Sequence, residues 1–210
     1  MSLLRIAALA AFLSFTPSLK AQIQVFGGPD PDRRGSSVFL FSDAMTVGAA
    51  ISYSGPVWKD DYNQMLDKLR GKNLRLGKNW WTSLDTSIAM EIGGKRLEAG
   101  AYFLGLHCDK DGNFHLMVFG ASEAMKQGLM PFAADDWKGG VVIPLALHKD
   151  SLKEPAKTMV LALEVDKQNP SNGTFSMHWG PHGLDAAVKF VLPEAKKEAK
   201  QEAKQEAKKG

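Results

Sequence analysis

The chain has 210 residues, of which 44% are hydrophobic and 23% are charged, so it can form a full-sized core and is too apolar for wholesale disorder. Its formal net charge of +3 is concentrated at the ends, because residues 1–21 and 194–210 hold eight basic and four acidic side chains. The remainder has a net charge of −1. A near-neutral body lacks the basic surface that nucleic-acid binding requires, so we expect no nucleic-acid partner.

The first 21 residues have the three-part order of a signal peptide. Arg5 lies in a short basic segment, residues 6–15 form an apolar run, and Ala21 offers a small residue for cleavage. The alternative is a mature amphipathic or buried helix. Ten apolar residues are too few to cross a bilayer, and no later stretch approaches about 18 apolar residues, so we expect no transmembrane segment in the mature chain. The segment predicts export, with a periplasmic or extracellular mature protein cleaved near Ala21.

The next part of the chain is predicted to be mainly β. Residues 22–42 are rich in Gly, Pro, Asp and Ser at their start and are interpreted as an irregular lead-in. Over residues 43–193, short strand-like segments alternate with turn signals; residues 84–92 alternate apolar and polar side chains, and Asp111-Gly112 is typical of a hairpin turn. This pattern predicts an antiparallel β-sandwich or barrel-like domain with one or two short helices.

A helix is predicted over residues 60–69. Its apolar side chains recur at the spacing of one helical face: Tyr62, Met65, Leu66 and Leu69. Asp60 or Asp61 is expected to cap its N-terminus, and Gly71 occupies the place of a left-handed residue after its C-terminus.

Residues 194–210 repeat a Glu-Ala-Lys pattern and contain no apolar residue larger than Ala. Like charges four residues apart oppose a helix, so we predict a charged tail that is helical or disordered. Its net charge of +2 would allow weak, salt-dependent contact with anionic surfaces. The alternative is a solubilising extension.

Three segments in order resemble a known family. Residues 94–104 (GKRLEAGAYFL) resemble the "GkxLpAGtYsl" segment of the domain of unknown function 2911 family of exported bacterial proteins. Residues 75–82 are similar to its "WRtGANeaT" segment, and residues 53–56 to its "YsRP". Gly55 and Leu74 stand where the family has Arg and Trp. The resemblance covers roughly residues 43–192 and implies a β-sandwich-like domain in an exported setting, without an established reaction.

The candidate binding residues are tryptophans in or beside predicted loops and polar residues of the family-like segment. The tryptophans are Trp58, Trp80, Trp81 and Trp137, and the polar residues are Arg75, Asn79 and Thr82. Exposed aromatic rings on a sandwich bind sugars or apolar partners, and the alternative is that these rings plug its open ends. The three polar residues form either a small polar site or structural contacts in a turn. Trp179 shares a strand face with Phe175 and Met177 and is predicted to be core.

A second candidate polar site involves His107, Cys108, His115 and His148. If Asp111-Gly112 is a two-residue turn, Cys108 opposes His115 at a distance suited to a thiolate–imidazolium pair; the alternative is a buried thiol beside a histidine. The histidines lie near strand ends but lack a recognisable metal-ligand spacing, so we expect no metal and no cofactor.

These patterns contain no complete catalytic constellation. They favour a non-catalytic exported binding module for a cell-envelope glycan or protein, with its site around Trp80 and Trp81. The alternative is a small hydrolase or metal-dependent enzyme that uses the histidines together with Arg75 and Asn79.

Overall fold

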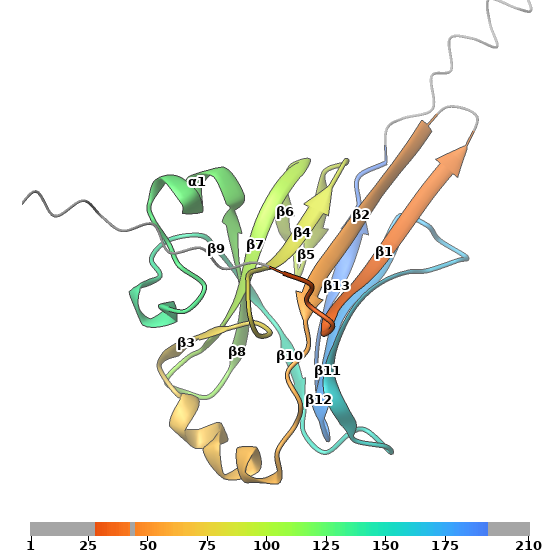
Figure 1. Ribbon diagram of the computed structural model, residues 1–210. Coiled ribbons are helices and arrows are strands. Elements are labelled where there is room, and N and C mark those ends of the chain that lie inside the picture. Colours follow the sequence, from red (N-terminus) through yellow and green to blue (C-terminus); the bar gives the residue numbers. More distant parts are fainter. Residues whose placement is uncertain (1–27, 43–44, 193–210) are drawn as a thin grey trace, which may run out of the picture.

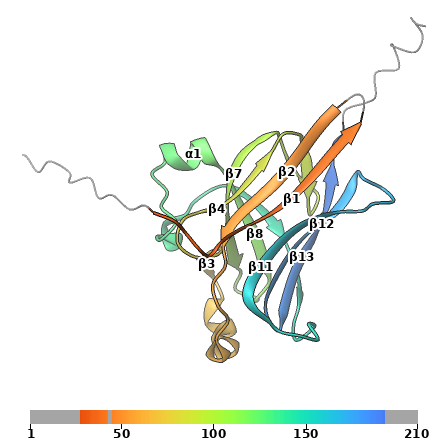
Figure 2. The same ribbon diagram turned by 45° about the vertical axis from the view of Figure 1, so that its right-hand side comes forward.

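A computed structural model of the protein describes residues 28–42 and 45–192, and within them two antiparallel sheets form a sandwich (Figures 1 and 2). The first sheet has the order β1-β2-β4-β7-β8-β9, with β3 also paired to β7. Its strands are β1 (Arg33–Ser42), β2 (Met45–Ser54), β3 (Lys72–Arg75), β4 (Thr82–Thr86), β7 (Gly100–Cys108), β8 (Phe114–Gly120) and β9 (Val141–Pro144). The predicted mainly β, antiparallel fold is confirmed.

The second sheet has the order β11-β12-β13-β5-β6, with β10 also paired to β13. Its strands are β5 (Met90–Ile92), β6 (Lys95–Leu97), β10 (Ala146–His148), β11 (Ala156–Val165), β12 (Asn172–Gly180) and β13 (His182–Phe190). Alternate side chains of both sheets fill one hydrophobic core between them. Its largest fully buried members include Ile51, Leu84, Leu104, Leu116, Phe175 and Phe190.

The prediction of an irregular segment over residues 22–42 is wrong for its second half. β1 begins at Arg33 and pairs with β2 along its whole length. Its polar residues suit a strand at the edge of a sheet, where half of the side chains face solvent. The hydroxyl of Ser36 donates to the carbonyl oxygen of Leu163 (3.3 Å) and accepts from its N–H (2.9 Å), which joins β1 to β11 of the other sheet. Residues 1–27, which include the predicted signal peptide, and the tail at 194–210 lie outside the described residues.

Two strand-like runs of the sequence are each divided between the sheets. The alternating run at residues 84–92 supplies the end of β4 and all of β5, and the apolar run at 141–148 supplies β9 and β10. At the first crossing the Thr86 hydroxyl donates to the carbonyl of Ile88 (2.7 Å) in a local turn. The alternation continues through the crossing because both halves point apolar side chains into the same core.

Three short helices complete the described part: η1 (Asp60–Leu69), α1 (Ala121–Lys126) and η2 (Ala134–Asp136). The helix predicted at residues 60–69 is confirmed in its bounds, but it is a 3₁₀-helix. Lys59 occupies its N-cap and makes no side-chain capping bond, so the predicted cap by Asp60 or Asp61 is wrong, whereas Gly71 has the expected positive φ of 73°. Within the described residues, no helix is long and apolar enough to span a membrane.

Candidate functional site

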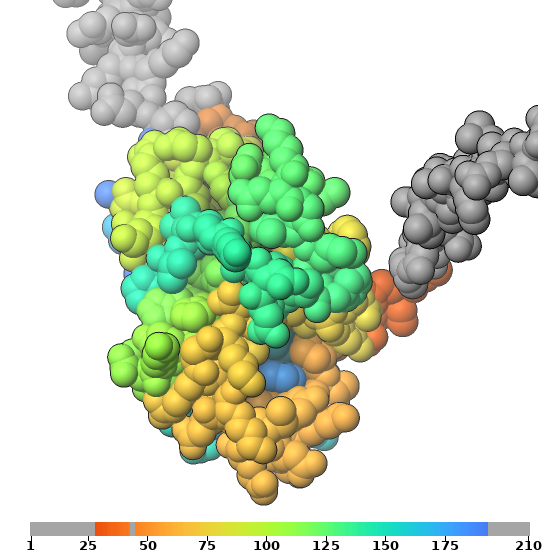
Figure 3. Space-filling view, turned by 90° about the vertical axis from the view of Figure 1, so that its left-hand side faces the viewer, coloured from red at the N-terminus to blue at the C-terminus, as the bar shows by residue number. Residues whose placement is uncertain are grey.

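A cavity of about 330 Å³ lies between the sheets beneath η1. Its apolar lining comes from three places: Tyr62, Met65, Leu66 and Leu69 of η1; Leu74, Leu106 and Phe114 of the first sheet; and Leu147, Met177, Trp179 and Leu184 of the second. The space-filling view shows a hollow bordered by the yellow and orange segment around η1, with blue atoms of the C-terminal strands inside it (Figure 3). A cavity of this size and character is typical of small-molecule sites.

Four rings form one wall of the cavity, and we call them the aromatic wall: Trp58, Tyr62, Trp179 and His182. The centroid of Trp58 lies 5.1 Å from that of Trp179 and 5.5 Å from those of Tyr62 and His182, in edge-to-face arrangements. The backbone N–H of Trp58 donates to Lys157 (2.8 Å), and its indole lies so close to Gly180 that a Cβ there would meet it at 2.3 Å. The wall therefore joins the start of η1 to β11 and β12.

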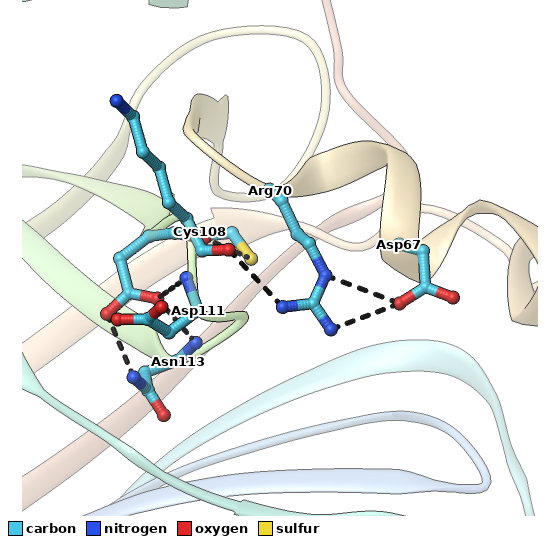
Figure 4. A network of polar contacts seen from close by, with 7 residues as sticks. Asp67, Arg70, Cys108, Asp111 and Asn113 are labelled. Atoms are coloured by element: carbon cyan, nitrogen blue, oxygen red, sulfur yellow. Dashed lines mark hydrogen bonds and ion pairs between the residues drawn. The ribbon is translucent and has the colours of Figure 1, made fainter.

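Residues 58–71, which we call the strap, cross this end of the sandwich and are held at a few points. In the middle, Nε2 of His182 donates to the side-chain oxygen of Asn63 (2.8 Å). At the far end, Arg70 donates to the carbonyl of Lys110 (3.3 Å) and pairs with the carboxylate of Asp67 (3.3 Å), as Figure 4 shows. No residue of η1 is fully buried, and a ten-residue 3₁₀ run is unusually long. The strap is thus a thinly packed cover over an apolar space.

Arg75 is the single Asp, Glu, Lys or Arg side chain among the residues that line the cavity. Its guanidinium donates to the carbonyl of Asn79 (3.2 Å) and lies 5.6 Å from the ring centroid of Phe132. Phe132 is 62% exposed, so this contact places Arg75 at the mouth of the cavity. The structure brings Arg75 to the site as a positioned cation.

Asn79 and Thr82 hold the neighbouring loop. Asn79 has a positive φ of 61°, which Asn tolerates better than most residues, and its side-chain amide donates to the Asp30 carboxylate (3.1 Å). Ser54 donates to the same carboxylate, and these two hydrogen bonds lower the pKa of Asp30. Thr82 is buried and donates to the carbonyl of Leu76 (2.6 Å). The two residues take the structural role that the sequence left open.

The expectation of exposed rim tryptophans is wrong for Trp81 and Trp137. Both are buried on the outer face of the first sheet, where Trp81 stacks on Phe103 (4.8 Å between centroids) and on Trp137 (4.9 Å). The segment containing α1 covers them. Trp58 is half-buried in the aromatic wall, and Trp80 is 54% exposed beside Phe132 (6.4 Å between centroids).

Cys108 does not oppose His115, and of the two alternatives the structure has the buried thiol. Cys108 faces Phe114, and His115 faces His107. The hairpin loop spans five residues because the Asp109 carboxylate accepts from the backbone N–H groups of Asp111 (2.9 Å) and Asn113 (2.8 Å) (Figure 4). This shift of one residue moves Cys108 to the core face and His115 to the opposite face.

Of the four residues of the second candidate site, only His107 and His115 lie together, with 5.9 Å between their ring centroids, whereas Cys108 faces the core and His148 belongs to the other sheet. The buried environment of Cys108 raises the pKa of its thiol, which makes it a poor nucleophile. His107 donates through Nδ1 to the side-chain oxygen of Asn73 (2.8 Å) on the outer face of the first sheet, and His148 bonds to the carboxylate of Asp185 (3.0 Å) in the second sheet. Among the described residues, no three His, Cys, Asp or Glu side chains are grouped so that they could hold a metal ion.

Sequence reasoning placed Trp58 and Arg75 among the candidate residues and missed the rest of the cavity. The helical stripe of Tyr62, Met65, Leu66 and Leu69 was the available signal, because a stripe of that kind must face something apolar. His182 had no signal of its own, since only the fold brings it to Asn63.

Comparisons with family models, with curated proteins and with solved structures found no match to this chain. Membership of the domain of unknown function 2911 family therefore stays a prediction from three short segments.

Proposed function

We propose that the protein is a non-catalytic binding module whose ligand is a small apolar or aromatic molecule held between the two sheets. The cavity of about 330 Å³ carries this proposal, because its lining contains no Asp, Glu or Lys. A dry apolar cavity of about 150 Å³ accepts benzene, so this one has room for roughly ten non-hydrogen atoms. Burial of apolar ligand surface supplies the affinity.

The strap supports the same proposal, because it offers a way into the cavity. It contacts the rest of the molecule through the aromatic wall, the His182–Asn63 hydrogen bond, Arg70, the hydrogen bond from Gly71 to the Asp109 carbonyl and the packing of Leu69 on the core. Exposed hydrogen bonds and the absence of fully buried residues in η1 favour local opening. A ligand that fills the cavity contacts the apolar stripe of η1 and thereby stabilises the closed position of the strap over the ligand.

The enzymatic alternative requires the histidines, Arg75 and Asn79 around one substrate. His148 belongs to the second sheet, His107 and His115 lie on the outer face of the first, and Asn79 supports a loop. The geometry favours binding over catalysis.

The experiment measures whether decan-1-ol raises the thermal midpoint and changes the intrinsic tryptophan fluorescence of the protein. Leu147→Phe adds volume to the cavity lining, and we expect it to abolish the response to the alcohol. Val142→Phe, a similar enlargement on an exposed edge strand, serves as the matched control and is expected to respond like the original protein. No response of the original protein, or an equal response from Leu147→Phe, contradicts the proposal.

A second candidate function uses Trp80, which was predicted as a rim residue and is exposed, together with its exposed neighbour Phe132. The two rings lie 6.4 Å apart at a surface position, and a flat exposed indole suits a sugar ring or an apolar protein side chain. This is the place where a cell-envelope glycan or protein would dock. Trp80→Ala should then reduce retention on cell-wall polysaccharide, whereas Leu147→Phe should leave it unchanged.

We also propose that the protein acts in the periplasm or outside the cell. The order of Arg5, the apolar residues 6–15 and Ala21 supports export, as does the resemblance to an exported family. N-terminal sequencing of the mature protein is expected to begin at or near Gln22. A start at Met1 in a membrane fraction would contradict export by this route.

A further inference from the structure

We propose that the natural ligand of the cavity is a monocarboxylate with an apolar body, and that Arg75 binds its carboxylate at the mouth. This inference rests on the proposed function, since it names the chemical class that the same cavity takes. The inference is based on Arg75, because an apolar ligand alone would give this positive charge no partner at the cavity.

Arg75 has donors to spare. A guanidinium carries five N–H groups, and in the described residues Arg75 uses one hydrogen bond, to the carbonyl of Asn79. Ion pairs among these residues join Arg70 to Asp67, Lys78 to Asp32, Arg96 to Glu98 and His148 to Asp185, and none includes Arg75. A half-buried guanidinium without a carboxylate partner favours an anionic ligand group.

The two carboxylates linked to the loop of Asn79 already have other partners. Asp30 accepts from Ser54 and Asn79, and Asp32 pairs with Lys78. Neither is available to neutralise Arg75 without breaking the contacts that hold the loop. The positive charge at the mouth is therefore left for a ligand.

The position of the guanidinium is set in advance. The Asn79 carbonyl holds it on one side and the Phe132 ring lies 5.6 Å away on another, so little side-chain freedom is lost when an anion binds. A planar fork of this kind matches the two oxygens of a carboxylate. One guanidinium also balances a single negative charge, whereas a phosphate monoester would bring about two.

The volume of the cavity limits the size of the apolar part of the ligand. About 330 Å³ holds roughly ten non-hydrogen atoms, which corresponds to a medium-length alkyl chain or a bicyclic aromatic group. The body would contact the η1 stripe and the aromatic wall, while the carboxylate remains at the half-exposed mouth. Partial exposure avoids the large cost of burying a charge completely.

The test compares three ligands with the same ten-carbon chain: decanoate, decan-1-ol and decylamine. Their dissociation constants are measured by titration calorimetry at neutral pH and low salt, for the original protein and for Arg75→Gln, Arg75→Lys and Arg96→Gln. Arg96 is an exposed, paired arginine on β6, so its replacement by Gln controls for the loss of one positive charge away from the cavity. Thermal midpoints of the unliganded variants establish that each is folded.

We expect the original protein to prefer decanoate over decan-1-ol by about tenfold, as a charge-assisted hydrogen bond allows. Arg75→Gln should remove most of this preference, Arg75→Lys should keep part of it, and Arg96→Gln should keep all of it. Equal binding of the acid and the alcohol, a preference for the amine, or a preference that survives in Arg75→Gln overturns the carboxylate proposal while the apolar site stands. Failure of all three ligands to bind overturns the proposed function itself.

Discussion

Two aromatic clusters in this molecule use similar residues and reach different outcomes. On the outer face of the first sheet, Trp81 lies between Phe103 and Trp137 with its flat faces covered, and the segment containing α1 closes over them. In the aromatic wall, Trp58 meets its neighbours edge-on, and a cavity of about 330 Å³ remains beside it. The presence of tryptophan therefore does not separate a binding site from a core. The difference lies in whether the covering segment fills the space beneath it.

The filled cluster is where we expect the largest loss of stability. The six-membered edge of the Trp137 ring packs against Gly105, where an added Cβ would meet it at 2.3 Å, and its indole N–H donates to the carbonyl of Met130 (2.8 Å). Trp137→Ala should lower the free energy of unfolding by about 3–5 kcal/mol. Urea denaturation measures it, with the exposed Trp80→Ala as control, which should stay within about 0.5 kcal/mol. Similar losses for the two variants would show that the outer cluster is not packed as described.

Enlarging a side chain should lower the stability beside the filled cluster and leave it nearly unchanged beside the cavity. Ala124 is the buried residue of α1 (2% exposed), so Ala124→Leu should cost about 1–3 kcal/mol through overpacking. Leu147→Phe, which lines the cavity, should be close to neutral because the new atoms enter empty space. Thermal and urea denaturation of the pair measure the contrast. Equal destabilisation would mean that the cavity is already filled by rearranged side chains.

The strap gives a smaller effect. Arg70→Ala removes the hydrogen bond to Lys110 and an exposed ion pair, so the global free energy of unfolding should fall by less than about 1 kcal/mol. Amide hydrogen exchange over residues 58–71 should nevertheless become faster, because the Arg70 contacts hold one end of the strap and their loss makes local opening easier. Lys68→Ala, on the same helix, is the control. Unchanged exchange in Arg70→Ala would remove Arg70 from the anchoring of the strap.

Low pH should destabilise the loop beside the cavity mouth by protonating Asp30. Its pKa is lowered in the folded protein by hydrogen bonds from Ser54 and Asn79, so its contribution to stability is present above its unfolded value of 3.8 and is lost as the pH falls through the folded value. Asp30→Asn should flatten the pH dependence of the thermal midpoint below about pH 4. Asp85→Asn, an exposed carboxylate on β4, should leave it unchanged. A steeper acid dependence in Asp30→Asn would contradict the assignment.

The sequence predicts the elements of this fold better than their partners. The period of two around Leu84 and the helical stripe from Tyr62 to Leu69 arise from local geometry, so strand residues and a helix occur at these two places, whereas β1 lies in a segment predicted to be irregular. The position of Cys108 depends on a loop that the Asp109 carboxylate organises, and one residue of shift reverses every face.

The candidate site follows the same rule. Trp58 and Arg75 lie in segments whose composition drew attention to them, and both line the cavity. Trp81 and Trp137 were selected on the same ground, as tryptophans in or beside predicted loops, but they are buried because the segment with α1 folds over them. Whether a ring is covered is decided by segments distant in the sequence, which local periodicity does not describe.

The two hydrogen bonds of Ser36 have a consequence for self-association. β11 is the outermost strand of its sheet, and the free N–H and C=O groups of such a strand are a template on which another chain can pair. By occupying both backbone groups of Leu163, one hydroxyl of β1 takes the place that a strand from a second molecule would use. The segment that was predicted to be an irregular lead-in thus covers this point of the β11 edge.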